Sequence, residues 1–558
     1  SPPQPSACWS GWRSSASKMN CFRRGHSFLH SHNHVLRRKM CPAVRRQTLC
    51  AAAADSNEDP LPFDSVISQR RRESANSLLV EVENRHRIIE LCQECLRYGN
   101  LTKAYYYAGK QQKCHVLLEF ETSESTHSLL RGCKHLSSDG FPVWSRLLKF
   151  VPKNSSRQPA TSIPVDIETC SVPSASQLST ELMRVATVSE QMVCFYENER
   201  LNDLELRLGF LVCRQIEEFI SGLYPRGSVL PFGSLVNGFG RHTCDIDMVY
   251  CVPESVDAKG QLYFQDKHQM INDRTLVQRI LETLGDLLHY VVPGVSEVHR
   301  ILRARVPIVK FQHDIVGREC DLTLNNMSGV DMSRVLHFCS QLAPSLGPLV
   351  FTLRGWASAQ GLTNKVPGTW ITNFQLTLLV IFHLQRKGLL PPLKALEENE
   401  RLPPYQPRSR CAHNFLYFLE ELLVSFFEYY SSVDFKSKSI SPYTGQLLEK
   451  PDYSAIHIQN PLDRQLNASR NVGTPDLRKL QSHMCGALSA LEEAVRGITQ
   501  EVPWGIAALL GDGKPHGNRR VEQAHRKFRV QELFQEGKGT PKTSYVVEAT
   551  ATGVKGAS

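Results

Sequence analysis

The sequence contains no Asp or Glu before residue 55. The same segment carries nine Lys and Arg residues, so removing them from the formal charge of +10 leaves +1 for residues 55–558. A net charge this close to zero does not indicate general binding to nucleic acid. Any RNA-binding surface in the rest of the chain is therefore expected to be a local patch.

The acid-free segment, residues 1–54, combines Arg with Ser. Positive charge without acidic residues is typical of a mitochondrial transit peptide, which is drawn across a polarised membrane. We therefore predict a leader over 1–54 and a location in the mitochondrial matrix. A basic tail without a targeting role is the alternative. At the other end, residues 511–558 are Gly-rich, polar and basic, which predicts a disordered tail.

Long apolar runs and a disulfide framework are also missing. The best apolar run, Leu376–Leu384, includes His383 and is far shorter than the roughly 20 residues that cross a bilayer, so we expect no membrane insertion. The 17 cysteines are dispersed without framework spacing, which favours reduced thiols. One C-x-x-C pair, Cys92 and Cys95, has no second pair at zinc spacing and is predicted to lie on a buried helix face.

Residues 75–150 have the pattern of a small α+β module. Strands are expected near 78–82, 101–107, 114–121 and 147–151, and helices near 87–98 and 124–132. This order resembles the RNA-recognition motif, whose sheet normally stacks bases on exposed aromatic rings. Here His115, Leu117 and Leu79 occupy positions where the motif has rings. An aliphatic sheet face favours contact with protein, including self-association, over contact with RNA.

Residues 151–186 are rich in Pro, Ser and Thr and are predicted to be a linker. Apolar residues at helical spacing follow over 201–224, and another helix is expected over 276–292. The pattern then becomes mostly helical. We therefore expect an α+β multidomain protein, with a mixed sheet and helices over 187–328 and a helical domain over 329–510.

The stretch FGSLVNGFGRHTCDIDMVY, residues 232–250, places glycines, a serine and two acids within an apolar run. Asp245 and Asp247 are two residues apart, so on a strand they would project from the same side. Neighbouring carboxylates repel each other, and a divalent cation such as Mg²⁺ removes that cost. Gly233 permits close approach of a phosphate, and Ser234 supplies hydrogen-bond donors. These residues predict half of a phosphoryl-transfer site.

A third carboxylate is expected in the segment ILRARVPIVKFQHDIVGRECDLTLNN, where two strands are predicted. Asp321 is the one acid there that lies between apolar strand residues, while Asp314 and Glu319 are assigned to turns. Four basic residues near these strands could meet phosphates, although solvated strand faces are the favoured interpretation: Arg303, Arg305, Lys310 and Arg318.

Gly-Ser followed by Asp-x-Asp and a later strand Asp resembles the DNA polymerase beta-like nucleotidyltransferases. The resemblance implies that residues 187–328 form the palm domain of that superfamily. It also implies that Asp245, Asp247 and Asp321 are the catalytic carboxylates and the ligands of Mg²⁺ or Mn²⁺.

The helical half of the sequence resembles a smaller group of enzymes within that superfamily. PGTWITNFQLTLLVIFHLQ is similar to the nucleotide-binding helix of poly(A) polymerases and terminal uridylyltransferases, and LRGWASAQGL to their triphosphate-contacting Lys-x-Trp-Ala-Lys helix. Arg354 and Ser358 stand where that helix has lysines. IHIQNPLDRQLNASRNVG is similar to the poly(A)-polymerase-associated region of the domain over 329–510. The resemblance implies these nucleotide-binding residues: Phe232, Gly233, Ser234, Arg354, Asn373 and Phe374.

Taken with the acid-free leader, these motifs are most similar as a set to the mitochondrial poly(A) polymerases, from about residue 70 to residue 510. The resemblance implies template-independent transfer of AMP from ATP to RNA 3′ ends on mitochondrial transcripts, by a two-metal mechanism. It also implies a homodimer formed through the 75–150 module. Three alternatives share parts of this pattern: a terminal uridylyltransferase, a catalytically silent RNA-binding or scaffold protein, and a nucleotide second-messenger synthase.

Overall fold

The structure, a computed structural model, describes residues 62–109, 113–134, 144–152, 165–169, 172–252, 273–364, 366, 368–398, 415–496 and 503–511. The predicted leader over 1–54 lies outside these residues, as does the predicted tail from residue 512 onward. Among the described helices, none has both the length and the apolar character needed to cross a membrane.

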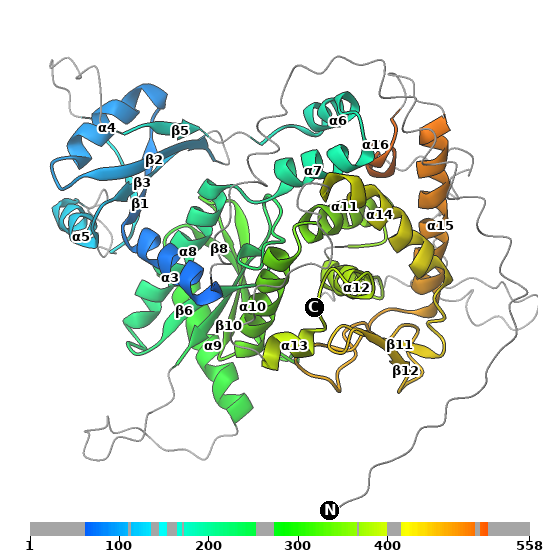
Figure 1. Cartoon of the computed structure of the whole chain (residues 1–558). Helices are drawn as coiled ribbons and strands as arrows, with labels where there is room; N and C mark the ends of the chain where they lie inside the picture. Colours follow the sequence, from blue (N-terminus) through cyan, green and yellow to red (C-terminus); the bar gives the residue numbers. More distant parts are fainter. Residues whose placement is uncertain are drawn as a thin grey trace, which may run out of the picture. The chain divides into compact units, whose positions relative to one another are not determined.

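The N-terminal module contains the first five-stranded sheet (Figure 1). Its elements are β1 (Ser77–Val82), η1 (Arg85–Arg87), α4 (Ile88–Cys95), β2 (Leu101–Ala108), β3 (Cys114–Phe120), α5 (Ser123–Gly132) and β4 (Leu147–Lys149). β3 lies between β1 and β2 and is antiparallel to both, whereas β4 is parallel to β1. This β-α-β-β-α-β order confirms the six predicted elements and is a split β-α-β arrangement. Cys92 and Cys95 are buried on α4, also as predicted.

The segment predicted to be a linker contains regular structure. β5 (Ile167–Thr169) pairs in parallel with β2 and extends the module's sheet. α6 (Ala175–Arg184) begins with a capping box between Ser174 and Gln177, and its Leu178 and Leu182 are buried. A sequence rich in Ser and Thr can therefore start a helix, because their side chains satisfy its first free N–H groups. The described part of 151–186 is thus more ordered than expected.

The aliphatic face of the module's sheet packs on the chain's own helix α8 (Asp203–Ser221). Leu79, Tyr105 and Leu117 are each 1% exposed, and they form one cluster with three residues of α8: Leu204, Leu208 and Leu211. The prediction of a protein contact is confirmed, but the contacting protein is this same chain. The sheet face is therefore not free to support self-association or to stack bases.

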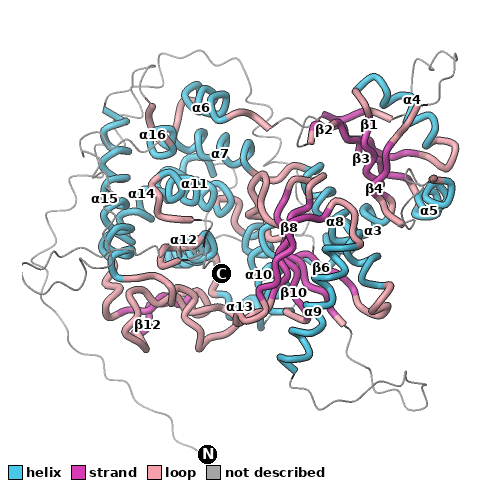
Figure 2. Tube along the Cα trace, turned by 180° about the vertical axis from the view of Figure 1, so that it is seen from behind, coloured by secondary structure: helices cyan, strands magenta, loops and turns pink. Residues whose placement is uncertain are grey.

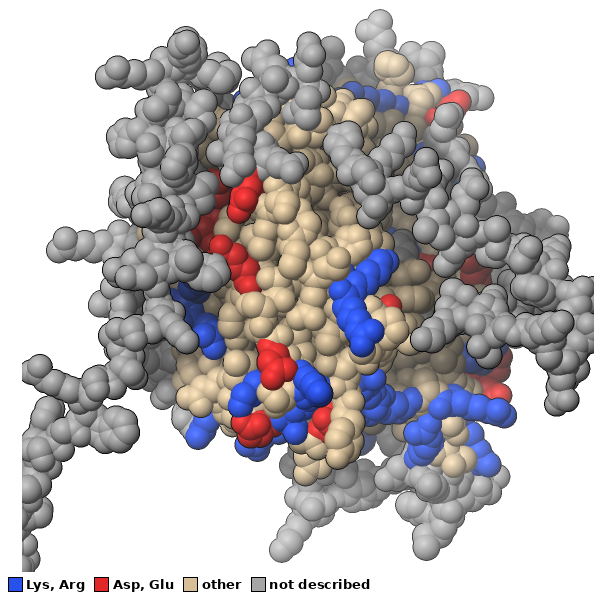
Figure 3. Space-filling view, turned by 90° about the vertical axis from the view of Figure 1, so that its right-hand side faces the viewer, with Lys and Arg blue, Asp and Glu red and all other residues tan. Residues whose placement is uncertain are grey.

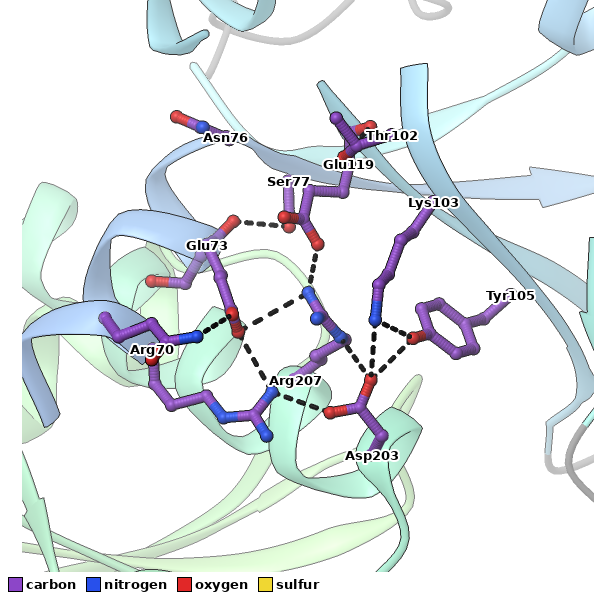
Figure 4. A network of polar contacts seen from close by, with 12 residues as sticks. Arg70, Glu73, Asn76, Ser77, Thr102, Lys103, Tyr105, Glu119, Asp203 and Arg207 are labelled. Carbon is purple, nitrogen blue, oxygen red and sulfur yellow. Dashed lines mark hydrogen bonds and ion pairs between the residues drawn. The ribbon is translucent and has the colours of Figure 1, made fainter. Parts of the chain in front are cut away.

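A network of charges surrounds this contact (Figure 4). Arg207 of α8, with 5% of its side chain exposed, pairs with Asp203, Glu119 and Glu73. The last of these lies on α3 (Phe63–Ala75), a helix that the sequence analysis did not predict. Tyr105 donates from its hydroxyl to Asp203 at 2.5 Å. Because the acids are satisfied by bases and a hydroxyl, the network fastens the module to α8 without a buried unpaired charge.

The second sheet has five strands in the order β6-β7-β10-β9-β8. They are β6 (Ser228–Phe232), β7 (Ile246–Cys251), β8 (Val295–Ile301), β9 (Ile308–His313) and β10 (Arg318–Leu324). One apolar core joins this sheet to α8 and to α9 (Asp273–Tyr290) through residues such as Ile216, Met248, Leu284 and Phe311. Figure 2 shows the two five-stranded sheets apart from each other, and α10 (Met327–Leu342) lies beside the labelled strands β8 and β10.

The helical half has its own core, which includes the fully buried Trp356 and Phe427. Its elements are α7 (Val188–Glu199), α11 (Leu346–Ala359), α12 (Asn373–Arg386), α13 (Leu393–Glu398), α14 (Phe415–Ser432), β11 (Lys438–Ser441), β12 (Gln446–Glu449), α15 (Thr474–Arg496) and α16 (Ile506–Leu510). α7 lies in the range predicted to belong to the sheet domain, but its Met192 and Phe195 pack in this helical core. The two halves therefore interleave along the sequence.

Candidate active site

Two of the predicted carboxylates lie side by side on neighbouring strands. Asp247 of β7 pairs in parallel register with Asp321 of β10 and in antiparallel register with Phe232 of β6. β7 begins at Ile246, so Asp245 lies in the loop just before the strand. Ile246 is buried whereas Asp245 is exposed. On the strand itself the predicted alternation therefore applies to Asp247, while Asp245 lies one residue before the strand.

The carboxylates perturb one another electrostatically. Burial, followed by the negative charges of Asp321 and Asp245, raises the pKa of Asp247 to about 7. Burial also raises the pKa of Asp321, against the opposing charge of Lys310, whose Nζ lies 3.4 Å from Asp321 Oδ1. A buried acid whose pKa is raised by two neighbouring carboxylates marks a site where positive charge is stabilised. Glu319, which was predicted to lie at a turn, is an exposed residue of β10 and pairs with Lys310 at 2.8 Å.

Gly233 begins the short helix η3 (Gly233–Leu235) and approaches Asp247 closely. Its φ is +70°, and a Cβ placed there would lie 2.1 Å from Asp247 Oδ2. Its N–H donates to Ser333 Oγ on α10 at 2.7 Å. Ser234 follows in η3 and is half-buried. Glycine is thus required here by backbone conformation and by the carboxylate beside it, in addition to the phosphate contact that the sequence suggested.

The loop between η3 and β7 is anchored in the helical half. Phe239 is 1% exposed and belongs to the core formed by α7, α11 and α12. Gly238, at φ +84°, approaches Ser340 of α10 so closely that a Cβ would lie 2.7 Å from its Oγ. A Cβ on Gly240 would lie 2.4 Å from the carbonyl oxygen of Ser234. Gly238 and Gly240 therefore do more than form a turn. Without side chains of their own, they let the Phe239 ring between them enter the helical core.

The last residues of this loop are held from the sheet side. Arg318, which was predicted to be solvated, is 4% exposed and donates to the carbonyl oxygen of Cys244 at 2.6 Å. His242 Nδ1 lies 2.6 Å from Glu205 Oε2 on α8. Burial alone would lower the pKa of His242, but the hydrogen bond to Glu205, the charges of Glu205 and Glu199 and the carbonyl oxygen of Asn198 together raise that pKa. Sequence analysis missed these contacts, because the partners are 37 and 74 residues apart.

The predicted nucleoside-binding pair lies at the start of α12, where Asn373 is exposed and Phe374 is half-buried. Thr372 caps this helix in a capping box with Gln375. The loop before the helix is held by Asn471, whose amide donates to the carbonyl oxygens of residues 368 and 370 at 2.9 and 2.8 Å. The sequence pattern therefore located the helix, while its anchoring came from a residue about a hundred positions away.

Two other predicted nucleotide-binding residues make their contacts within the protein. The Phe232 ring packs so closely against Gly329 of α10 that a Cβ there would lie 2.8 Å from it. Arg354 of α11 is 8% exposed and donates to the carbonyl oxygen of Phe239 at 2.8 Å and to Thr377 Oγ1 at 2.7 Å. Arg354 thus uses two of its five N–H donors on protein acceptors.

The three Asp side chains supply oxygen atoms, which are the ligands that Mg²⁺ and Mn²⁺ prefer. The raised pKa of Asp247 indicates that a cation would relieve their repulsion. In the described part of the chain, however, no three His, Cys, Asp or Glu side chains form a ready metal-binding group. The donor set therefore fits a hard divalent cation in its chemistry, and the side chains would draw together around it.

Basic residues near the sheet give a local rather than a continuous positive surface. Arg303 and Arg305 are exposed, and Arg305 lies 3.5 Å from Asp463 of the helical half. Figure 3 shows one face of the molecule, on which Lys and Arg are mixed with Asp and Glu near the lower edge, and a separate small basic group lies at mid-height beside a broad uncharged area. On that face the described residues form no continuous basic track that would identify an RNA path.

Comparison with known proteins identifies the family. The family model described as "Poly(A) RNA polymerase, mitochondrial-like, central palm domain" matches residues 188–341. A "Poly(A) RNA polymerase, mitochondrial" of Drosophila melanogaster is 33% identical over 556 residues, covering 91% of this chain and 90% of its own. The chain belongs to the mitochondrial poly(A) RNA polymerase family. It is therefore a nucleotidyltransferase, as the Gly-Ser and Asp-x-Asp motifs predicted.

Solved structures of this family have the same fold. The chain is 30% identical to "mtPAP in complex with UTP", with a TM-score of 0.72, and the match covers 81% of this chain and 99% of that one. For "mtPAP in complex with ATPgammaS" the TM-score is 0.71 at the same identity and coverage. The predicted mixed sheet with helices, the palm of the nucleotidyltransferases, is thus confirmed as an α+β fold.

Proposed function

We propose that the chain adds AMP from ATP to the 3′ ends of RNA without a template, and that it acts on mitochondrial transcripts in the matrix. The observation that carries this proposal is the strand register that places Asp247 beside Asp321, with Gly233 against Asp247. The names of its relatives support adenylation as the activity. The composition of residues 1–54 supports the location.

In this proposal the carboxylates carry the chemistry. Asp245, Asp247 and Asp321 would hold Mg²⁺ or Mn²⁺, which when bound neutralise phosphate charge and make the RNA 3′-hydroxyl more acidic. The 3′-oxygen bonds to the α-phosphorus of ATP while the bond to the bridging oxygen of the β-phosphate breaks, so pyrophosphate leaves. Asp321 would receive the hydroxyl proton, and the ammonium of Lys310 at 3.4 Å favours its ionised form.

The nucleotide is proposed to lie between the two halves of the enzyme. The backbone and hydroxyl of Ser234 would meet the triphosphate, next to the close approach of Gly233 to Asp247. Asn373 would contact the ribose or triphosphate, and the ring of Phe374 would stack on the base. Structures of the family contain UTP as well as an ATP analogue, so occupancy of the site by a nucleotide does not by itself decide which base is transferred.

The deciding experiment offers the full chain an RNA primer, Mg²⁺, and each NTP alone and in mixture. Adenosine tails formed preferentially from the mixture are the expected result. Preferential uridine tails would identify a terminal uridylyltransferase, and product that does not depend on RNA would identify a second-messenger synthase. Failure with every NTP would support a silent RNA-binding protein and refute the proposal.

A pair of substitutions on one strand separates catalysis from structure in the same assay. We expect Asp321→Asn to lower the rate by about 100-fold or more, because it removes the proposed proton acceptor and metal ligand. Glu319→Gln, two residues earlier on β10 and also in contact with Lys310, is exposed and serves as the matched control. Wild-type tailing by the Asp321 variant would contradict the assigned role.

The mitochondrial location is a further part of the proposal. Fusion of residues 1–54 to a reporter should direct it to the matrix, and a cytosolic reporter would contradict the leader.

We also propose a homodimer formed through the 75–150 module, using a surface other than the sheet face, since α8 covers that face. Sedimentation of the full chain should give a dimer, and a monomer at all concentrations would refute this assembly.

A further inference from the structure

Arg354 is a buried cation without an acidic partner among the described residues. No Asp or Glu side chain in that part of the chain lies within ion-pair distance of its guanidinium, and its Nε has no hydrogen-bond partner. Burial and then the charge of Arg241 lower the pKa of Arg354 to about 10, so it remains protonated at neutral pH. A buried charge of this kind is costly unless hydrogen bonds compensate for lost water. Its two hydrogen bonds are therefore important to its placement.

The two acceptors lie on two segments whose relative position must be fixed for the proposed reaction. One is the carbonyl oxygen of Phe239, in the loop that leads to Asp245, and the Phe239 ring lies 5.8 Å from the guanidinium carbon. The other is Thr377 Oγ1 on α12. The Thr377 hydroxyl in turn donates to the carbonyl oxygen of Asn373 at 2.8 Å. One guanidinium thus connects the loop before the carboxylates with the first turns of the proposed nucleoside-binding helix.

We propose that Arg354 is a positioning residue that ties the 238–240 loop to α12, and that it is not a ligand of the triphosphate. The inference deepens the proposed function and rests on it. It also accounts for arginine where the related helix has lysine, because a planar guanidinium can donate to two acceptors in different directions while its face lies on a ring. A lysine would have to reach both acceptors from one nitrogen, whereas here two different guanidinium nitrogens donate to them.

Thr377 provides the sharpest test, because it contacts Arg354 and is not proposed to touch the nucleotide. Thr377→Val keeps the shape of the side chain and removes the acceptor, whereas Thr377→Ser keeps the hydroxyl. Thr352→Val is the matched control, because Thr352 lies on α11 and is fully buried, and its hydroxyl has no hydrogen-bond partner among the residues that the structure describes. AMP addition to an RNA primer is measured as kcat and as the KM for ATP, with the melting temperature of each variant.

We expect Thr377→Val to lower kcat about tenfold and to leave the KM for ATP within about twofold, because the loss of a charged donor's acceptor loosens the 238–240 loop that leads to Asp245 without removing a nucleotide contact. Thr377→Ser and Thr352→Val should stay within about twofold of the wild type. Arg354→Lys should also lower kcat, and the double variant with Thr377→Val should be no slower than Arg354→Lys alone, since both disrupt the same connection.

The opposite pattern overturns the inference. A rise of more than about tenfold in the KM for ATP with Arg354→Lys, together with wild-type kinetics for Thr377→Val, would make Arg354 a phosphate ligand. Additive effects of the two substitutions would also refute a shared connection. A wild-type chain that adds no nucleotide to RNA would refute the proposed function itself, so the two failures can be told apart.

Discussion

At the scale of single residues, Gly233 has two separate reasons to be glycine, and they can be tested apart. Its φ of +70° disfavours any side chain, and a Cβ would lie 2.1 Å from Asp247 Oδ2. Gly388 has the same φ, but a Cβ there would meet no atom of the described residues within 4 Å. Backbone strain is thus common to both sites, whereas contact with a carboxylate occurs only at the first.

We therefore expect Gly233→Ala and Gly388→Ala to lose similar stability, about 1 kcal/mol from the left-handed backbone, but to differ in activity. Gly233→Ala should displace Asp247 and lower primer extension by about 100-fold or more, while Gly388→Ala should keep the wild-type rate. Unfolding midpoints and extension rates are measured on the same preparations. Equal rates for the two variants would show that the approach to Asp247 has no role in the reaction.

His242 and Glu205 give stability a pH dependence whose sign follows from their pKa shifts. The folded pKa of His242 is raised above 6.5, so its contribution is present below that pH and lost as pH rises through the raised value. Burial opposes ionisation of Glu205, but hydrogen bonding to His242 lowers its pKa below 4.5, so its contribution is lost only in acid. The charge of Glu199 also favours protonated His242.

His242→Gln should therefore lower the melting temperature most near about pH 6 and progressively less toward about pH 8. The measurement is a set of thermal melts of wild type and variant across this range. His299→Gln, at an exposed position on β8, is the control substitution and should change the melting temperature little. A constant difference between wild type and His242→Gln would show that the charged pair does not form.

At the scale of elements, the position of the loop before α12 depends on the donor end of the Asn471 side-chain amide. Asn471 donates its NH₂ to two carbonyl oxygens of that loop. Asn460 uses only its Oδ1, which accepts from two backbone N–H groups at 2.9 and 3.0 Å. A carboxylate can replace an accepting oxygen, but it repels a carbonyl oxygen and cannot donate to it.

We expect Asn471→Asp to release the 368–370 loop and lower AMP addition about tenfold or more, while Asn460→Asp leaves the rate within about twofold. The readouts are the extension rate and the KM for ATP, because Asn373 follows this loop directly. If the two substitutions have the same effect, the loop is not positioned by the Asn471 amide.

Much of this arrangement could be predicted, for a physical reason that differs from element to element. Asp247 and Asp321 were predicted as strand residues because each lies among apolar strand residues, and the six elements of the module were predicted because each has its own periodicity. The partners of Arg354 lie 115 and 23 residues away and have no local signal. Comparable distances separate Asn471 from its loop, so the anchoring of the site needed the structure.

At the scale of the whole molecule, α8 shows what periodicity leaves open. The sequence predicted the helix, but both of its apolar faces are used: Ile216 packs in the core beneath the second sheet, while Leu208 packs against the module. Apolar spacing indicates that a face is buried, not which element buries it. The module was accordingly expected to offer its sheet to a second molecule, and instead it closes on its own chain.

The final prediction concerns this internal docking. Arg207 is nearly buried among Asp203, Glu119 and Glu73, so Arg207→Met would leave the nearly buried Glu119 without its strongest partner. We expect a loss of about 3 kcal/mol or more, as for other buried ion pairs that lose one member. Arg97→Met removes an ion pair of the same module whose arginine is 66% exposed.

The exposed pair should contribute under about 1 kcal/mol, because water and salt screen it. Urea unfolding of both variants measures the difference, and limited proteolysis should cut the Arg207 variant faster at the junction between the module and α8. Because α8 also holds His242 through Glu205, undocking should lower the rate of AMP addition together with stability. Equal unfolding midpoints for the two variants would mean that the network in Figure 4 does not fasten the module.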